Sequence, residues 1–182
     1  MSETHKDIIV FHPTVHEDSR GYFMELWNQY DYVKANIPYF FERFVQDNVS
    51  FSHQNVFRGL HFQNPNPQGK LVSVLQGEVF DIVVDLRQKS KTFKKWQGFL
   101  LSDKNHTQIY IPPGFAHGFV TLSITALFHY RCTNFYYAED EQSIRWNDPE
   151  LDIKLPVDNP ILSQKDAEAK LLKEIQIERL FD

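Results

Sequence analysis

Alternating hydrophobic and polar residues dominate the middle of the chain. Residues 71–75 and 79–86 are two runs rich in β-branched and other apolar residues, and a short Gln76-Gly-Glu78 segment joins them. A glycine between two such runs is typical of a tight turn. The pattern therefore predicts a β-hairpin in the centre of the chain.

The second of these runs has two chemically different faces, because successive side chains of a strand point to opposite sides. One face is apolar and consists of Phe80, Ile82, Val84 and Leu86. The other face consists of Asp81, Val83, Asp85 and Arg87. This second face is polar enough to line a cavity.

More short β-rich runs follow at regular intervals. They span residues 99–101, 107–111, 118–122 and 126–132. Ser, Asp and Asn residues or a Pro-Pro-Gly sequence separate them, and such spacing is typical of an antiparallel sandwich or barrel. The chain is therefore predicted to be an all-β protein.

Helical patterns are confined to two places, a short stretch near residues 30–36 and the C-terminus. At the C-terminus, Ser163-Gln-Lys-Asp166 has the form of a capping box, which starts a helix by satisfying its first backbone N–H groups. The hydrophobic spacing after it predicts a helix that runs through Leu171, Leu172 and Ile175.

Length and composition indicate one soluble domain that comprises residues 1–182. The chain has 182 residues, of which 42% are hydrophobic and 24% are charged, so it can bury a core but has no room for a second full domain. No apolar run approaches the length of a membrane span, and residues 1–7 are too polar for a signal peptide. We expect a cytoplasmic protein without a membrane partner.

Charge and cysteine content exclude further classes. The net charge of -5 argues against a nucleic-acid-binding surface, although it permits a small basic pocket. Cys132 is the single cysteine, so no internal disulfide can form. Neither a CxxC pair nor a Cys/His cluster with zinc spacing occurs in the sequence.

The strongest chemical signal lies just before the predicted hairpin. Arg58-Gly-Leu-His-Phe-Gln63 and Gln68-Gly-Lys-Leu-Val72 place an arginine, a histidine and a lysine around a short connection. A guanidinium can bind a phosphate, an imidazole can accept a proton near neutral pH, and an ammonium can stabilise an oxyanion. Together these groups could enolise a ketone on a phosphorylated substrate.

Eight short motifs, in order and in spacing, resemble the dTDP-4-dehydrorhamnose 3,5-epimerase family. The resemblance extends from roughly the tenth residue to the start of the C-terminal helix. The motifs are Asp18-Ser-Arg-Gly-Tyr-Phe-Met-Glu25, Gln46-Asp-Asn48, Arg58-Gly-Leu-His61, Gln68-Gly-Lys70, Val84-Asp-Leu-Arg87, Ile111-Pro-Pro-Gly-Phe-Ala-His-Gly-Phe119, Tyr130-Arg-Cys-Thr133 and Trp146-Asn-Asp-Pro149.

The resemblance implies an antiparallel jelly-roll barrel of the cupin type, a homodimer and an epimerase that needs no cofactor. It also implies the substrate, a dTDP-linked 4-keto-6-deoxy sugar that is inverted at C3 and C5 to give dTDP-4-dehydro-L-rhamnose. The chemistry agrees, because a ketone at C4 acidifies both neighbouring carbons. One base, one oxyanion stabiliser and one acid on the far side can therefore invert two centres.

The resemblance also assigns catalytic roles. His61 is expected to be the base, Lys70 to hold the enolate, and Tyr130 to return the proton from the opposite face. Asp166 is expected to orient His61, but as the fourth residue of the capping box it could instead only cap the helix. Asp81 or Asp85, on the polar strand face, could also pair with His61.

Other positions match the family's ligand-binding residues. Arg20, Phe23 and Glu25 resemble the segment that reaches across the dimer to the nucleotide in the neighbouring subunit. Arg58 fits the diphosphate, and Tyr136 matches the position that stacks on the pyrimidine. The remaining matches are Gln46, Asn48, Glu141 and Lys165. For each of these residues, a surface charge or a packed aromatic ring is an equal alternative on the sequence alone.

His117 suggests a metal site, because many cupins bind iron or manganese through such a histidine. Metal cupins also need an HxH pair, but here His61-Phe-Gln63 has glutamine in place of the second histidine. We therefore expect His117 to contact substrate and no metal to be bound.

Two departures from the family pattern bear on specificity. The connection at residues 63–68 is shorter than the usual loop, and Asn55-Val-Phe57 replaces a glycine-led approach to Arg58. Such changes can alter which sugar fits the pocket.

Two rival functions stay open: a single-centre epimerase or ketoisomerase on a related nucleotide sugar, and a non-catalytic sugar-binding barrel. The combination of His61, Lys70 and Tyr130 argues against the second.

Overall fold

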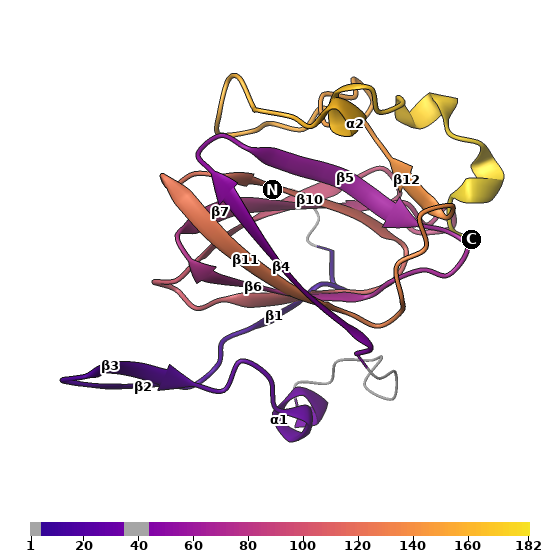
Figure 1. Ribbon diagram of the computed structural model, residues 1–182. Helices are drawn as coiled ribbons and strands as arrows, with labels where there is room; N and C mark the ends of the chain where they lie inside the picture. Colours follow the sequence, from indigo (N-terminus) through magenta and orange to yellow (C-terminus); the bar gives the residue numbers. More distant parts are fainter. Residues whose placement is uncertain (1–4, 35–43) are drawn as a thin grey trace.

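A computed structural model describes residues 5–34 and 44–182, and its main feature is a pair of five-stranded antiparallel sheets (Figure 1). The first sheet has the order β1 (Ile9–Phe11), β9 (Gln108–Ile111), β6 (Lys70–Gln76), β11 (Thr125–Cys132) and β4 (Gln46–His53). The second sheet has the order β12 (Glu141–Ser143), β5 (Phe57–Gln63), β10 (Phe115–Thr121), β7 (Glu78–Asp85) and β8 (Trp96–Ser102). The predicted all-β jelly-roll barrel with short helices is confirmed.

The predicted central hairpin is wrong. β6 pairs with β9 and β11, whereas β7 pairs with β8 and β10, so the two strands belong to opposite sheets. At Gly77, which has a φ of 83°, the chain crosses from one sheet to the other. Val72 and Val74 then face Val79 and Val83 across a shared core, since all four are buried in one hydrophobic cluster.

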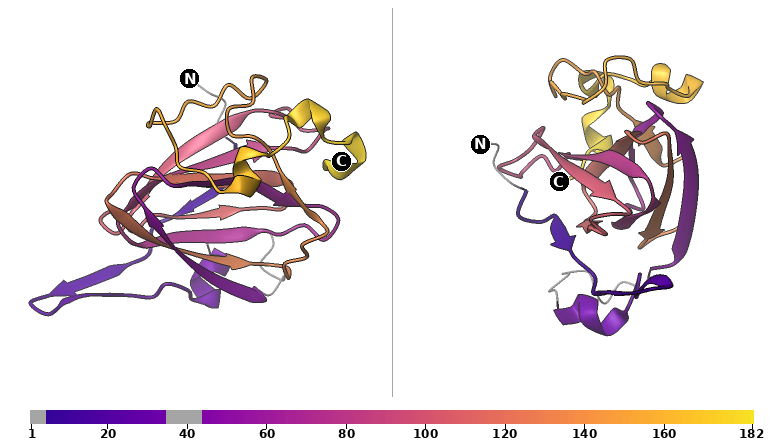
Figure 2. Two further views of the ribbon diagram at one scale, coloured as in Figure 1. Left: turned by 45° about the horizontal axis from the view of Figure 1, so that its top comes forward. Right: turned by 90° about the vertical axis from the view of Figure 1, so that its left-hand side faces the viewer.

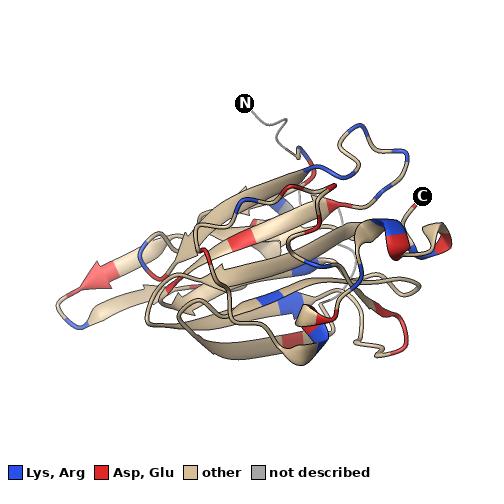
Figure 3. Cartoon of the chain, turned by 90° about the horizontal axis from the view of Figure 1, so that it is seen from above, with Lys and Arg blue, Asp and Glu red and all other residues tan. Residues whose placement is uncertain are grey.

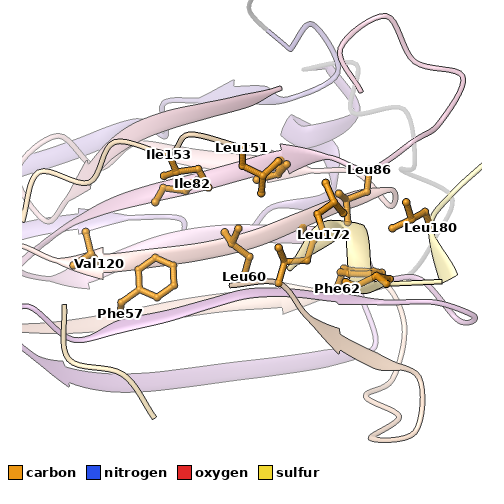
Figure 4. Close-up of a cluster of buried hydrophobic side chains, with 14 residues drawn as sticks. Phe57, Leu60, Phe62, Ile82, Leu86, Val120, Leu151, Ile153, Leu172 and Leu180 are labelled. Atoms are coloured by element: carbon orange, nitrogen blue, oxygen red, sulfur yellow. The ribbon is translucent and has the colours of Figure 1, made fainter. Parts of the chain in front are cut away.

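The two faces of β7 are used as the sequence predicted. Ile82, Val84 and Leu86 belong to a second hydrophobic cluster on the outer side of the second sheet. The C-terminal part of the chain covers this side and contributes Leu151, Leu172 and other apolar side chains (Figure 4). Asp81 and Val83, on the opposite face, point between the sheets, so a buried carboxylate enters the interior.

The long C-terminal helix is also a wrong prediction. Ser163 does cap a helix, because its hydroxyl accepts a hydrogen bond from the Asp166 backbone N–H, but this helix, α2, spans only Gln164–Ala167. The chain then runs extended past Ile144 before the 3-10 turns Leu172–Glu174 and Ile177–Arg179. Leu172 is buried and its N–H binds the Asp148 carboxylate, so tertiary contacts override the helical spacing.

The N-terminal part forms a separate ribbon and a short helix. Strands β2 (Val15–Asp18) and β3 (Gly21–Met24) form a two-stranded sheet with each other and project away from the barrel (Figures 1 and 2). Helix α1 spans Gln29–Lys34, which confirms the first predicted helix in part, since its remaining residues lie outside the described ranges. Among the described residues, no helix combines the length and hydrophobicity needed to cross a membrane.

Candidate active site

A cavity of about 420 Å³ opens between the two sheets and beneath the C-terminal segment. The four residues with predicted catalytic roles, His61, Lys70, Tyr130 and Asp166, all line it. The rest of its wall consists of Ser50, Val56, Phe57, Arg58, His117, Phe119, Phe128, Ile161, Leu162, Ser163 and Lys165. Residues from distant parts of the sequence thus meet in one pocket.

A bulge in β5 brings Arg58 and His61 to the same side. Residues three positions apart in a regular strand face opposite ways. Here Phe119 pairs with Arg58 and His117 with His61, so two residues of β5 stand opposite Gly118 alone. Gly59 is at φ 131°, and a Cβ there would lie 2.6 Å from the Gly118 Cα, so the close approach requires glycine.

His61 and Asp166 form a close pair. His61 Nε2 lies 2.6 Å from Asp166 Oδ1, and the carboxylate also accepts the Gly59 backbone N–H. Burial opposes ionisation of Asp166, but the bonds from His61, Ser163 and Gly59 outweigh it and lower the pKa of the carboxyl. Because Nε2 is held by Asp166, Nδ1 is the ring nitrogen left to accept a proton.

The alternative partners of His61 are engaged elsewhere. Asp81 Oδ2 lies 2.8 Å from His117 Nε2, so this pair forms a second histidine–aspartate dyad in the pocket wall. Burial and the positive charge of Lys70 lower the pKa of His117, although Asp81 acts in the opposite direction.

Asp85 accepts bonds from Arg87, Ser90 and Thr92. Burial opposes its ionisation, but these bonds prevail and lower the pKa of Asp85 to about 2. Asp85 therefore holds the end of β7 and plays no part in the pocket.

Lys70 and Tyr130 come from the first sheet, opposite His61. In the β6–β11 pairing Lys70 stands beside Cys132, and its Nζ lies 6.0 Å from the centre of the Tyr130 ring. Burial lowers the pKa of Lys70. Burial raises the pKa of Tyr130, so its phenol keeps its proton at neutral pH.

Several predicted binding residues surround the mouth of the pocket. Arg58 Nε is held by the Ser52 hydroxyl at 3.0 Å. Glu141 accepts hydrogen bonds from Tyr136 Oη, at 2.8 Å, and from Lys165 Nζ. Burial opposes ionisation of Glu141, but these two bonds outweigh it and lower the pKa of the carboxyl. The Lys165 side chain thereby joins the pocket wall to the loop that carries Tyr136.

Gln46 and Asn48 lie side by side on edge strand β4, with Gln46 Nε2 donating to Asn48 Oδ1 at 2.9 Å. Gln46 Oε1 also accepts the Tyr136 backbone N–H, so this pair belongs to the same rim.

The structure does not bring Arg20, Phe23 and Glu25 to this pocket. Arg20 pairs with Asp18 on the projecting ribbon, and Phe23 is 66% exposed. Glu25 accepts a bond from Asn28 near the ribbon's base. These three residues lie outside the pocket wall of their own chain.

Some wall residues were not predicted. Phe119 and Phe128 stack with their ring centroids 4.0 Å apart, and they could have been found because they lie two residues from His117 and Tyr130 on the same strand faces. Ile161 and Leu162 carried no such signal, since they belong to an irregular segment more than a hundred residues from Val56, with which Ile161 forms a bridge.

The distribution of charged residues and of potential metal ligands can be followed over the described part of the chain. Basic and acidic residues are interspersed along the chain (Figure 3). Within residues 5–34 and 44–182, no three His, Cys, Asp or Glu side chains come together as metal ligands.

Comparison with known proteins identifies the family. The family model described as dTDP-4-dehydrorhamnose 3,5-epimerase matches residues 3–174. A dTDP-4-dehydrorhamnose 3,5-epimerase of Pseudomonas aeruginosa is 51% identical over 166 residues, which are 90% of this chain and 90% of that protein.

Solved structures agree. The Legionella pneumophila dTDP-6-deoxy-D-glucose-3,5-epimerase in complex with dTDP-4-keto-L-rhamnose has a TM-score of 0.93 and 46% identity, and the match covers 98% of this chain and 95% of that chain. A 3'-monoepimerase of Streptomyces bikiniensis in complex with dTDP-quinovose has a TM-score of 0.83 and 30% identity, with coverage of 92% and 84%. The chain therefore belongs to the dTDP-4-dehydrorhamnose 3,5-epimerase family and is an isomerase.

Proposed function

We propose that the chain converts dTDP-4-dehydro-6-deoxy-D-glucose to dTDP-4-dehydro-L-rhamnose by inverting C3 and C5. One observation carries the proposal: His61 and Tyr130 enter a single pocket from opposite sheets. Inversion requires a base on one face of the sugar ring and an acid on the other. A pocket that lay on one sheet alone could not supply both faces.

In the first step, His61 Nδ1 takes the proton from the carbon beside the C4 ketone. The electron pair of the C–H bond moves into the ring to form an enolate, and the negative charge collects on the C4 oxygen. Asp166 stabilises the imidazolium that results, because its carboxylate is 2.6 Å from Nε2 and its pKa is held low. The pair thus fixes both the tautomer and the direction of the base.

Lys70 stabilises the enolate. Its ammonium group projects into a pocket walled by Phe119 and Phe128, where a positive charge acts on an oxyanion more strongly than in water. Tyr130 then gives its phenolic proton to the carbon from the opposite face and regains a proton from solvent, while His61 releases to solvent the proton that it removed. The same sequence at the second carbon completes the reaction without a net change in protons.

The nucleotide part of the substrate is assigned to the rim. Arg58 binds the diphosphate, Tyr136 stacks on the pyrimidine, and Gln46 and Asn48 supply neutral hydrogen-bonding groups. His117 contacts the sugar from the pocket wall. Support for this assignment comes from the rim's bonds, which connect Tyr136 to Gln46 and, through Glu141, to Lys165 at the pocket edge.

Deuterium incorporation tests the activity directly. We expect the protein, incubated with dTDP-4-dehydro-6-deoxy-D-glucose in deuterated water, to introduce deuterium at both C3 and C5, as counted by NMR. A sample without protein corrects for spontaneous enolisation. Label at one carbon would establish a single-centre epimerase instead, and absence of label at both would indicate a non-catalytic binding protein.

The single-centre alternative has a specific basis. A 3'-monoepimerase shares this fold at 30% identity, so the family's structure by itself does not fix the number of centres. The short connection at residues 63–68 adjoins the rim and could change how the sugar turns in the pocket. The deuterium count decides between the two.

We also propose that the chain acts as a homodimer in which the β2–β3 ribbon reaches the pocket of the partner. The ribbon pairs with no other strand among the residues that the structure describes, and it exposes Tyr22 and Phe23. Large exposed aromatic side chains on a projecting arm suit a surface that another subunit covers. The Arg20 side chain, 87% exposed, would then meet the nucleotide bound by the partner.

Arg20→Ala is expected to leave a folded dimer with weaker substrate affinity. Loss of one charge-assisted hydrogen bond to phosphate would raise KM about tenfold. Lys89→Ala, which removes an exposed cation on the barrel, is the matched control and should not change KM. Sedimentation velocity gives the oligomeric state of the variant. A KM equal to that of the wild type would show that Arg20 is an ordinary surface charge without a role in substrate binding.

A further inference from the structure

Residues 134–140 form an irregular loop, here called the aromatic loop, that carries Phe135, Tyr136 and Tyr137. Side-chain amides from neighbouring segments hold its backbone. Gln46 accepts the Tyr136 N–H at 2.8 Å, and Gln68 donates to the Asn134 carbonyl at 2.9 Å. A loop without regular secondary structure therefore keeps a defined position at the pocket mouth.

One of these amides is different from the others. Gln63, the last residue of β5, is only 4% exposed, and its side chain binds the two peptide groups on either side of Tyr136. Its Nε2 donates to the Phe135 carbonyl at 3.0 Å, and its Oε1 accepts the Tyr137 N–H at 2.8 Å. The remaining Nε2 proton goes to the Asn66 carbonyl.

We propose that Gln63 is a positioning residue that fixes the backbone at Tyr136 and thereby sets the affinity for the nucleotide part of the substrate. Two hydrogen bonds from one rigid amide restrict the peptide groups before and after Tyr136. They thereby direct its ring, whose hydroxyl binds Glu141. Gln63 lies outside the wall of the pocket, so it acts on the ligand through the segments that its side chain holds, chiefly the aromatic loop.

The chemistry of glutamine suits this task. A side chain here must donate to one peptide group and accept from the next, and the glutamine amide does both, from two separate atoms and without carrying a charge. In Gln63→Met the side chain has nearly the same length but makes neither bond. The Tyr137 N–H and the Phe135 carbonyl then lose their partner, which favours release of the loop into water.

The inference rests on the proposed function, because it assigns Tyr136 to the nucleotide, but the anchorage of the loop can be tested separately. Chymotrypsin cleaves after Phe and Tyr, so the aromatic loop is a natural reporter. Under native conditions we expect Gln63→Met to be cut after residues 135–137 much faster than the wild type. Gln88→Met is the control, since Gln88 also donates to a backbone carbonyl, that of Ile177, but lies away from the loop.

Binding and kinetics complete the test. By calorimetry, Gln63→Met should bind dTDP about tenfold or more weakly, because the nucleotide must first order the loop. Turnover at saturating substrate should change far less than KM, since no pocket residue has changed. Cleavage at the wild-type rate, or unchanged dTDP affinity, would overturn the inference. Absence of dTDP binding by the wild-type protein would instead overturn the proposed function and this inference with it.

Gln63→Glu separates hydrogen bonding from general damage to the fold. As a carboxylate, the new side chain can accept the Tyr137 N–H but cannot donate to the Phe135 carbonyl. Burial raises the pKa of a carboxyl, and its protonated form regains a donor. Relative to wild type at each pH, dTDP affinity should therefore recover from about pH 8 to about pH 5. A deficit that stays constant over this interval would contradict the proposal.

Discussion

His61→Ala is expected to abolish both turnover and solvent-deuterium exchange into the substrate. If His61 is the base, no enolate forms without it, and both measurements depend on the enolate. General-base losses are typically about 100- to 10,000-fold. The rate of epimerisation and the NMR signals at C3 and C5, followed in deuterated water, give the two quantities from one sample.

His53→Ala provides the matched control, because this histidine is exposed on β4 and lies outside the pocket wall. His61→Asn adds a second control, since its amide can still bond to Asp166 and so preserves more of the local packing. Continued exchange in either His61 variant, at a rate near that of the wild type, would show that another group removes the proton. Asp166 would then have no base to orient.

The sequence predicted most strands because hydrophobic alternation is a local property that survives in the folded chain. The runs at 107–111 and 126–132 became β9 and β11 with small changes at their ends. The choice of partner strand, in contrast, depends on residues that are far apart in the sequence. The turn at Gly77 suggested a hairpin, but β6 and β7 each find better partners in different sheets and meet only through their side chains.

The C-terminus also shows that contacts between distant residues can override a local sequence signal. Ser163 and Asp166 carry a valid helix-start signal, and the helix does begin there. It ends after four residues, because Leu172 must reach the core beneath the second sheet and its N–H is taken by Asp148. Only the folded barrel supplies those partners.

The catalytic set was recognisable from the sequence through resemblance, but its geometry was not. Asp166 is 105 residues away from His61, and Asp81 or Asp85 remained an alternative partner on the strand pattern alone. The sequence marks the bulge that turns Arg58 and His61 to the same side only by Gly59 itself, and a glycine in a strand does not tell which residues change side. Gln63 attracted notice only for the histidine that it replaces, and its contact with the aromatic loop becomes visible in three dimensions.

Tyr130→Phe is expected to uncouple exchange from inversion. The variant keeps the aromatic ring and its packing against Phe128, but it loses the proton that the mechanism delivers to the far face. His61 remains able to remove a substrate proton. Because its side chain is 27% exposed, the imidazolium can exchange that proton with solvent before returning it to the same face. Substrate should therefore acquire deuterium while the rate of inversion falls by about 100-fold or more.

Tyr30→Phe is the matched control, because it removes a phenolic proton from an exposed residue of α1, outside the pocket wall. Its inversion and exchange should both remain near the wild-type rates. Inversion by Tyr130→Phe at the wild-type rate would mean that another acid, or a water molecule, serves the far face. Loss of exchange together with inversion would place Tyr130 in the proton-abstraction step. The assignment of the base to one sheet and of the acid to the other would then be wrong.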